Sequence, residues 1–129
     1  MKQEPWPARA ENPRPSGRGE VNEFWTAVCR YDDLQPERGV AALVGGEQVA
    51  LFRAFDGTLY AIGNQDPFTG AFVLSRGIVG TRGGIPTVAS PLHKQVFDLR
   101  TGVCLEDGTA AAGVFGVRVR DGVVEVAAG

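Results

Sequence analysis

Apolar and polar residues alternate in the C-terminal part of the chain, between turn residues spaced at short intervals. The valines of this part are predicted to face a core: Val117, Val119, Val124 and Val126. The charged residues among them are predicted to face water: Arg118, Arg120 and Glu125. Such alternation is typical of β-strands with one buried face. We therefore expect a β-hairpin here.

Glycine-containing dipeptides separate other predicted strands in the same way. Three of them fit hairpin turns: Gly45-Gly46 between 40–44 and 48–55, Asp56-Gly57 before 58–62, and Asp121-Gly122 between 117–120 and 123–126. These residue types tolerate the positive φ of such turns. Sixteen valines against eight leucines also favour strands, because β-branched side chains fit a pleated sheet. We expect an all-β fold, an antiparallel sandwich or barrel of about eight to eleven short strands.

Helix is predicted weakly and in one place. Residues 31–38 could form one or two turns that begin with an aspartate cap and end at Gly39. The fold is therefore expected to contain little helix.

Residues 1–20 differ in composition from the rest of the chain. They contain four of the eight prolines and one large apolar side chain, Trp6. Such a segment buries too little apolar surface to offset the entropy lost on ordering, so we expect a flexible tail. The alternative is that Trp6 docks on a partner together with nearby arginines: Arg9, Arg14 and Arg18. Residues 21–129 are expected to form one domain.

Charge and composition exclude several functions. The formal net charge is -2 and the pI is about 5.4, which gives no basic field for nucleic acid. No apolar run is long enough to cross a membrane, and the N-terminus has no signal-peptide core. We expect a cytoplasmic protein whose two cysteines, Cys29 and Cys104, remain thiols and serve as small core residues.

Two short segments have the spacing of an iron-sulfur site but lack most of the ligands. A Rieske [2Fe-2S] cluster uses a Cys-x-His box and a later Cys-x-x-His box. The corresponding segments here are Asn64-Gln65-Asp66 and Ser90-Pro91-Leu92-His93, in which only His93 is a ligand of the right type. The amide of Asn64 and the hydroxyl of Ser90 are poor substitutes for thiolates. Cys29 and Cys104 lie far from both boxes in the sequence, so we expect neither a metal site nor a catalytic site in this chain.

The sequence around these boxes resembles a known family. The resemblance is carried by residues 66–71, 74–80 and 90–107, and it extends over about residues 22–127. This region resembles the small subunit of the assimilatory NAD(P)H-dependent nitrite reductase, a Rieske-like domain known as a family for lacking the cluster. The resemblance implies a Rieske-like fold for residues 21–129. It also implies that four residues stand at degenerate cluster-ligand positions: Asn64, Asp66, Ser90 and His93.

The resemblance further implies a partner. In the family, a large subunit carries FAD, an iron-sulfur cluster and siroheme, and it reduces nitrite to ammonium in nitrate assimilation. This chain would hold none of these cofactors and would have no active site of its own. Its expected role is to bind and support that large subunit in the cytoplasm.

Loss of the cluster would leave the two boxes without their cross-link. Asp66 and His93 match the family's histidine ligands, which bind one iron, so we expect these two side chains to lie close together. They could form a hydrogen bond with each other, or each could bind nearby backbone amides. The alternative is that His93 is an ordinary exposed loop residue.

The segment from Phe68 to Gly84 is predicted to be a loop that contributes to a partner interface. It contains aromatic and arginine side chains, which are common in interaction hot spots: Phe68, Phe72, Arg76 and Arg82. The alternative is that the two phenylalanines fold inward and fill the volume near the missing cluster. The arginines are expected outside in either case.

Two other functions remain open from the sequence. The chain could be a Rieske-type electron carrier, or it could be a stand-alone interaction or small-ligand module on a degenerate Rieske fold. In the second case Asp66 and His93 would line a polar pocket. A nucleophilic active site is not expected, because the surroundings of His93 lack the motifs that activate a serine.

Overall fold

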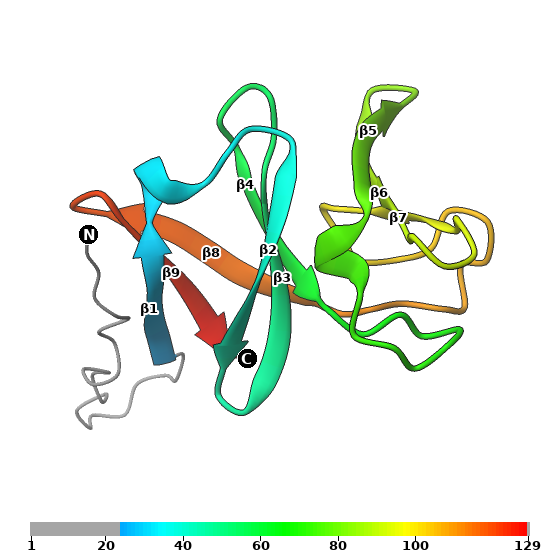
Figure 1. Cartoon of the computed structure of the whole chain (residues 1–129), viewed down its shortest axis with the longest axis horizontal. Coiled ribbons are helices and arrows are strands. Elements are labelled where there is room, and N and C mark those ends of the chain that lie inside the picture. The colour runs from blue at the N-terminus through cyan, green and yellow to red at the C-terminus, as the bar shows by residue number, and fades with distance from the viewer. Residues whose placement is uncertain (1–23, 129) are drawn as a thin grey trace.

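The computed structural model describes residues 24–128. The predicted tail, residues 1–20, lies outside this range. In the described range, nine strands form two antiparallel sheets, and the helical segments are short 3₁₀ turns (Figure 1). The predicted all-β antiparallel fold with little helix is confirmed. None of the helical segments in residues 24–128 has the length and apolar character needed to cross a bilayer.

The larger sheet has six strands and curls into a nearly closed barrel. Their order is β1 (Phe24–Arg30), β9 (Val123–Ala128), β8 (Val114–Arg120), β4 (Leu59–Gly63), β3 (Glu47–Arg53) and β2 (Arg38–Val44). The outer strands β1 and β2 contact each other, which brings the two edges of the sheet together. A first core fills the barrel, and its most buried side chains are aliphatic: Val28, Leu34, Val44, Val49, Leu51, Val124 and Val126.

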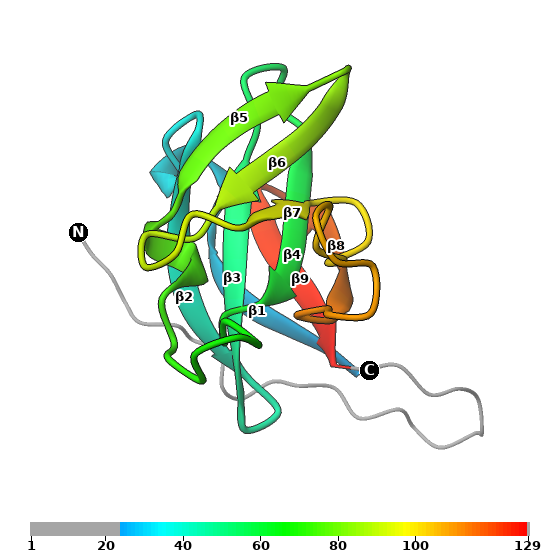
Figure 2. The ribbon, with the colours of Figure 1, turned by 90° about the vertical axis from the view of Figure 1, so that its right-hand side faces the viewer.

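The smaller sheet covers one side of the barrel. It consists of β5 (Ile78–Arg82), β6 (Ile85–Ala89) and β7 (Val96–Asp98), and Figure 2 shows it lying across β3 and β4. A second core lies between the sheets: Ala50, Phe52, Ile62, Leu74, Val88, Phe97, Leu99 and Cys104. Strand β3 therefore supplies both cores, which explains its continuous apolar run.

The predicted hairpin turns are confirmed. Gly45-Gly46 joins β2 to β3, and Asp121-Gly122 joins β8 to β9, each with positive φ at both residues. Asp56-Gly57 lies between β3 and β4, which pair antiparallel.

Three predictions about local structure are wrong. The segment 31–38 forms only a 3₁₀ turn, η2 (Tyr31–Asp33), with no side-chain cap, and Tyr31 N–H donates instead to Gly122 O in the β8–β9 turn. Val119 is 46% exposed, because it lies at the hairpin end of β8, beyond the cover of the first core. The predicted loop 68–84 contains η3 (Leu74–Arg76) and strand β5.

Two glycines allow the close approaches that position the candidate site. Gly63 immediately precedes Asn64, and a Cβ there would overlap the carbonyl oxygen of Ala112. A Cβ on Gly77 would overlap the carbonyl oxygen of Ala89, which immediately precedes Ser90. Only glycine fits such backbone contacts, so these residues fix where both segments of the site begin.

Candidate functional site

The two predicted segments meet at one end of the molecule. Residues 64–73 connect β4 to η3, and residues 90–95 connect β6 to β7; we name them the tip loops (Figure 2). Three of the four predicted positions are buried there: Asn64, Asp66 and Ser90. His93 is exposed.

A buried hydrogen bond joins the tip loops. The hydroxyl of Ser90 donates to Oδ2 of Asp66 over 2.7 Å. The other carboxylate oxygen, Oδ1, accepts from the backbone N–H of Phe68 at 2.8 Å, and Oγ of Ser90 accepts from the backbone N–H of Leu92 at 3.3 Å. These three hydrogen bonds connect the backbone at Phe68 to the backbone at Leu92. Because the side chains are buried, breaking this chain would leave unpaired polar groups.

Asn64 connects the first tip loop to β3 and to η3 through hydrogen bonds. Its Oδ1 accepts from the backbone N–H of Ser75 at 2.7 Å, and its Nδ2 donates to Oε1 of Gln48 at 3.0 Å. Its backbone also bonds to Gln48 and Leu74. The amide therefore connects the start of β3 to η3, and both ends of its side chain are occupied.

The predicted hydrogen bond between Asp66 and His93 is not present. Among the described residues, no hydrogen bond or ion pair joins these side chains, and both oxygens of Asp66 bind other groups. His93 lies on the exposed part of its turn, whereas Ser90 lies at the buried start. The other possibility, binding to nearby backbone amides, matches the bond from Phe68 to Asp66. Nothing in the sequence spacing distinguishes Ser90 from His93 as the partner.

The residues at the tip do not fit a [2Fe-2S] cluster. Such a cluster needs two thiolates and two imidazoles in the Rieske arrangement, and the three buried positions offer an amide, a carboxylate and a hydroxyl that already bind one another or the backbone. In residues 24–128, no group of three or more His, Cys, Asp or Glu side chains is arranged to hold a metal ion.

The two cysteines lie in the cores, as thiols. Cys29 is on β1 beside the first core, where burial, and secondarily the charge of Asp33, raises its pKa to about 11. Burial also raises the pKa of Cys104, which belongs to the second core. A raised pKa lowers the fraction of thiolate, which is the reactive form.

The predicted interface residues do not all share one environment. Phe68 is 38% exposed and Phe72 is 49% exposed, and the ring of Phe68 packs on Phe97 with 6.3 Å between centroids. The two phenylalanines are thus only partly turned inward. Arg76 and Arg82 are exposed, as expected.

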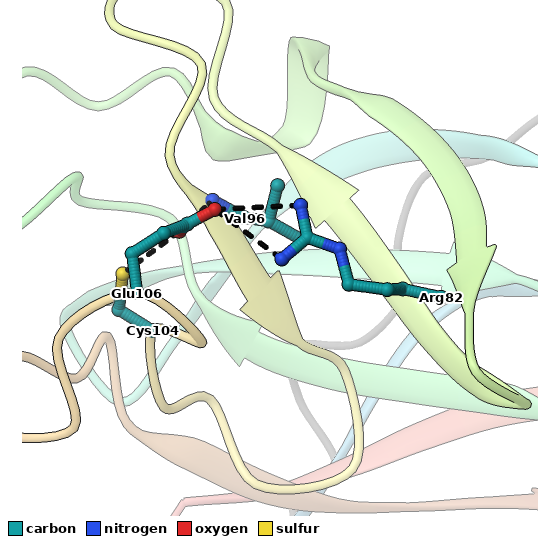
Figure 3. A network of polar contacts seen from close by, with 4 residues as sticks. All are labelled: Arg82, Val96, Cys104 and Glu106. Carbon is teal, nitrogen blue, oxygen red and sulfur yellow. Dashed lines mark hydrogen bonds and ion pairs between the residues drawn. The ribbon is translucent and has the colours of Figure 1, made fainter.

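Arg82 takes part in a polar cluster that the sequence did not predict. Its guanidinium lies 3.4 Å from Oε2 of Glu106, whose Oε1 accepts from the backbone N–H of Val96 and the thiol of Cys104 (Figure 3). The Val96 amide is the main reason that the pKa of Glu106 is lowered. The cluster connects the loop after β7 to the small sheet, and Arg82, at the end of β5, is turned toward Glu106 in that loop.

Comparison with known proteins agrees with this geometry. Residues 24–127 match the Rieske-like [2Fe-2S] domain family, and the fold with its paired tip loops is of this class. The chain is 48% identical over 103 residues to the nitrite reductase (NADH) small subunit of Salmonella typhimurium, over 79% of this chain and 95% of that protein. It therefore belongs to the family of nitrite reductase small subunits, as the sequence predicted. The crystal structure of an NADH-dependent nitrite reductase small subunit from Mycobacterium tuberculosis gives a TM-score of 0.82 at 50% identity, covering 84% of this chain and 98% of that one.

A similar segment also occurs inside a longer protein. The nitrite reductase [NAD(P)H] large subunit of Klebsiella oxytoca is 42% identical over 102 residues, which are 79% of this chain and 11% of that protein. A domain of this kind is therefore a minor part of that large-subunit polypeptide.

Proposed function

We propose that this chain is the non-catalytic small subunit of a cytoplasmic NAD(P)H-nitrite reductase, a cluster-free Rieske-like domain that binds and supports the large subunit. The observation that carries the proposal is the buried hydrogen bond between Ser90 and Asp66. It joins the two segments that match the Rieske ligand boxes, and it does so without metal. Because residues 24–128 contain no group of side chains arranged to hold a metal, we infer that the function of the domain is attachment.

The Klebsiella oxytoca protein supports the large subunit as partner. There, a segment similar to this chain is covalently part of a large subunit, so we infer that the separate chain occupies a comparable position by non-covalent binding. The arrangement of the domain permits this. Phe24 pairs with Ala128, so the two ends of the described chain lie together, and Figure 1 shows them on the barrel side, away from the small sheet. The tip loops lie on the other side of the described residues, beside the small sheet.

The chemistry would reside in the partner. We propose that the large subunit carries FAD, an iron-sulfur cluster and siroheme and reduces nitrite to ammonium during nitrate assimilation. The two thiols, which form no disulfide, support a reducing compartment. The proposed contacts with the large subunit include the exposed aromatic and arginine residues: Phe68, Phe72, Arg76 and Arg82.

Co-expression with the large subunit of the same organism tests this function. The complex is expected to elute as one species in size-exclusion chromatography, and this chain alone is expected to be colourless. A chain that never associates with the large subunit would support a stand-alone module instead. Visible absorption with bound iron would support the electron-carrier alternative.

A further inference from the structure

We propose that the main contact with the large subunit is one preformed surface at the tip loops, and that the complementary surface of the partner is apolar with an acidic rim. We name this the tip surface: Phe68, Phe72, Leu92, His93 and Lys94. This proposal rests on the proposed function and specifies where and by what chemistry the partner binds.

Large apolar side chains from both tip loops are exposed. Phe68, Phe72 and Leu92 are 38%, 49% and 48% exposed, respectively. Phe68 and Phe72 come from the first loop, whereas Leu92 comes from the second, 20 or more residues away in the sequence. Apolar residues that gather from separate segments are typical of a partner-binding patch, whereas exposed apolar residues scattered singly are ordinary.

The buried hydrogen bonds connect the backbones of the two loops that carry these side chains. The backbone N–H of Phe68 donates to Asp66, the hydroxyl of Ser90 also donates to Asp66, and the backbone N–H of Leu92 donates to Ser90. Phe68 and Leu92 are therefore held at the two ends of one chain of hydrogen bonds. The backbone N–H of Asp66 donates to the carbonyl oxygen of Ala71, and Gln65 pairs with Phe72 in an isolated antiparallel β-bridge. These two backbone contacts position Phe72 within the first tip loop. A surface that is ordered before binding loses less entropy on association.

Lys94 carries the exposed positive charge of the tip loops. Only three ionisable side chains occur in residues 64–73 and 90–95, and the acidic one, Asp66, is buried and hydrogen-bonded. Lys94 is exposed and positively charged, and His93 beside it is an exposed hydrogen-bond donor or acceptor. A partner with carboxylates around an apolar centre complements this surface, whereas a basic partner does not.

Two exposed apolar residues outside the tip loops come from single turns. Phe55 is 74% exposed in the turn after β3, and Val119 is 46% exposed at the hairpin end of β8. Each comes from one turn and lies beside charged neighbours, Asp56 and Arg120. They are suitable control positions, because their substitution removes exposed apolar surface without touching the tip.

The test is the affinity of the full chain for the large subunit of the same organism, measured by calorimetry at low and high salt. The double variant Phe68→Ala/Phe72→Ala is expected to weaken binding by about 30-fold or more, as loss of hot-spot residues does. Lys94→Glu is expected to weaken binding by about tenfold at low salt and to lessen the salt dependence. Matched controls at exposed positions away from the tip, Phe55→Ala and Arg120→Glu, are expected to bind within about twofold of the wild type.

A separate variant tests the role of the buried hydrogen bonds. Ser90→Ala leaves every exposed side chain in place, yet it should weaken binding by about fivefold, because the loops are no longer ordered before association. Thermal melting confirms that each variant is folded. If the wild type binds the large subunit but the tip variants bind equally well, the tip surface is not the interface and the proposed function stands. If the wild type does not bind at all, both the surface and the proposed function are overturned.

Discussion

The barrel and the tip loops are stabilised by different interactions. The first core consists of buried aliphatic side chains, such as Leu51 and Val124, and none of the buried polar residues in the described range lies on a barrel strand. At the tip the pattern is reversed. Of the six buried polar residues in the described range, four belong to the tip loops or contact them: Asn64, Asp66, Ser75 and Ser90.

The difference shows how a loop pair can keep its arrangement without a metal. Apolar burial is non-directional and contributes most of the stability, whereas buried hydrogen bonds contribute less but specify geometry. We therefore expect the barrel to determine whether the chain folds, and the tip to determine whether the folded chain presents one binding surface.

The largest effect is expected in the barrel. Leu51→Ala removes a fully buried side chain from β3 and leaves a cavity in the first core. The free energy of unfolding should fall by about 3 kcal/mol. Urea denaturation measures this loss. A loss below about 1 kcal/mol would mean that the barrel is not the main source of stability.

A smaller and more local effect is expected at the tip. Asp66→Ala removes the acceptor for both the Ser90 hydroxyl and the Phe68 N–H, which should lower the free energy of unfolding by about 2 kcal/mol. Hydrogen exchange should become faster at Phe68 and Leu92 while the amides of β3 stay protected. Asp66→Asn is the matched control, because its amide can still accept from Phe68 and can donate to Ser90. Equal losses for the alanine and asparagine variants would contradict the account.

Acid should affect one buried carboxylate of the small sheet. Asp98 binds Arg100 through its side chain, and this bond lowers the carboxyl pKa. A lowered folded-state pKa contributes stability above the unfolded-state pKa of about 4, and this contribution is lost as the pH falls through the folded-state value. Asp98→Asn should therefore be less stable than the wild type by about 1 kcal/mol at pH 7. The difference in stability between the two proteins should vanish in acid, and thermal melting across this pH range measures it. A difference that persists in acid would contradict the prediction.

The smallest effect is expected for the ion pair on the outside of the small sheet. Arg82 lies 3.4 Å from Glu106, and both side chains are largely exposed. Arg82→Gln should change the free energy of unfolding by less than about 0.5 kcal/mol, because water and salt screen such pairs. A larger loss in urea denaturation would show that the polar cluster around Glu106 stabilises the second core.

The sequence predicted the barrel better than the tip, for a physical reason. Gly45-Gly46 and Asp121-Gly122 carry a local turn preference, so the hairpins could be located without knowledge of the rest of the chain. The exposure of Val119 depends on where the core ends, which alternation alone does not show. In the segment 31–38, the helical preference is weak, and the hydrogen bond to the β8–β9 turn favours a different conformation.

At the tip, the spacing of the two boxes predicted which segments meet but not which atoms bond. Both Ser90 and His93 were within reach of Asp66 in sequence terms. The choice between them depends on the turn after β6, which leaves Ser90 inside and His93 outside. The role of Glu106 was missed because a glutamate within Cys104-Leu105-Glu106-Asp107 carries no distinguishing pattern.

The claim that hydrogen bonds take the place of a cluster at the tip can be tested most directly by iron and acid-labile sulfide analysis. The protein should be purified without oxygen, so that a labile cluster would survive. The account predicts a folded, colourless chain without stoichiometric iron or sulfide. Iron and sulfide in stoichiometric amounts, with the visible absorption of a [2Fe-2S] cluster, would contradict it.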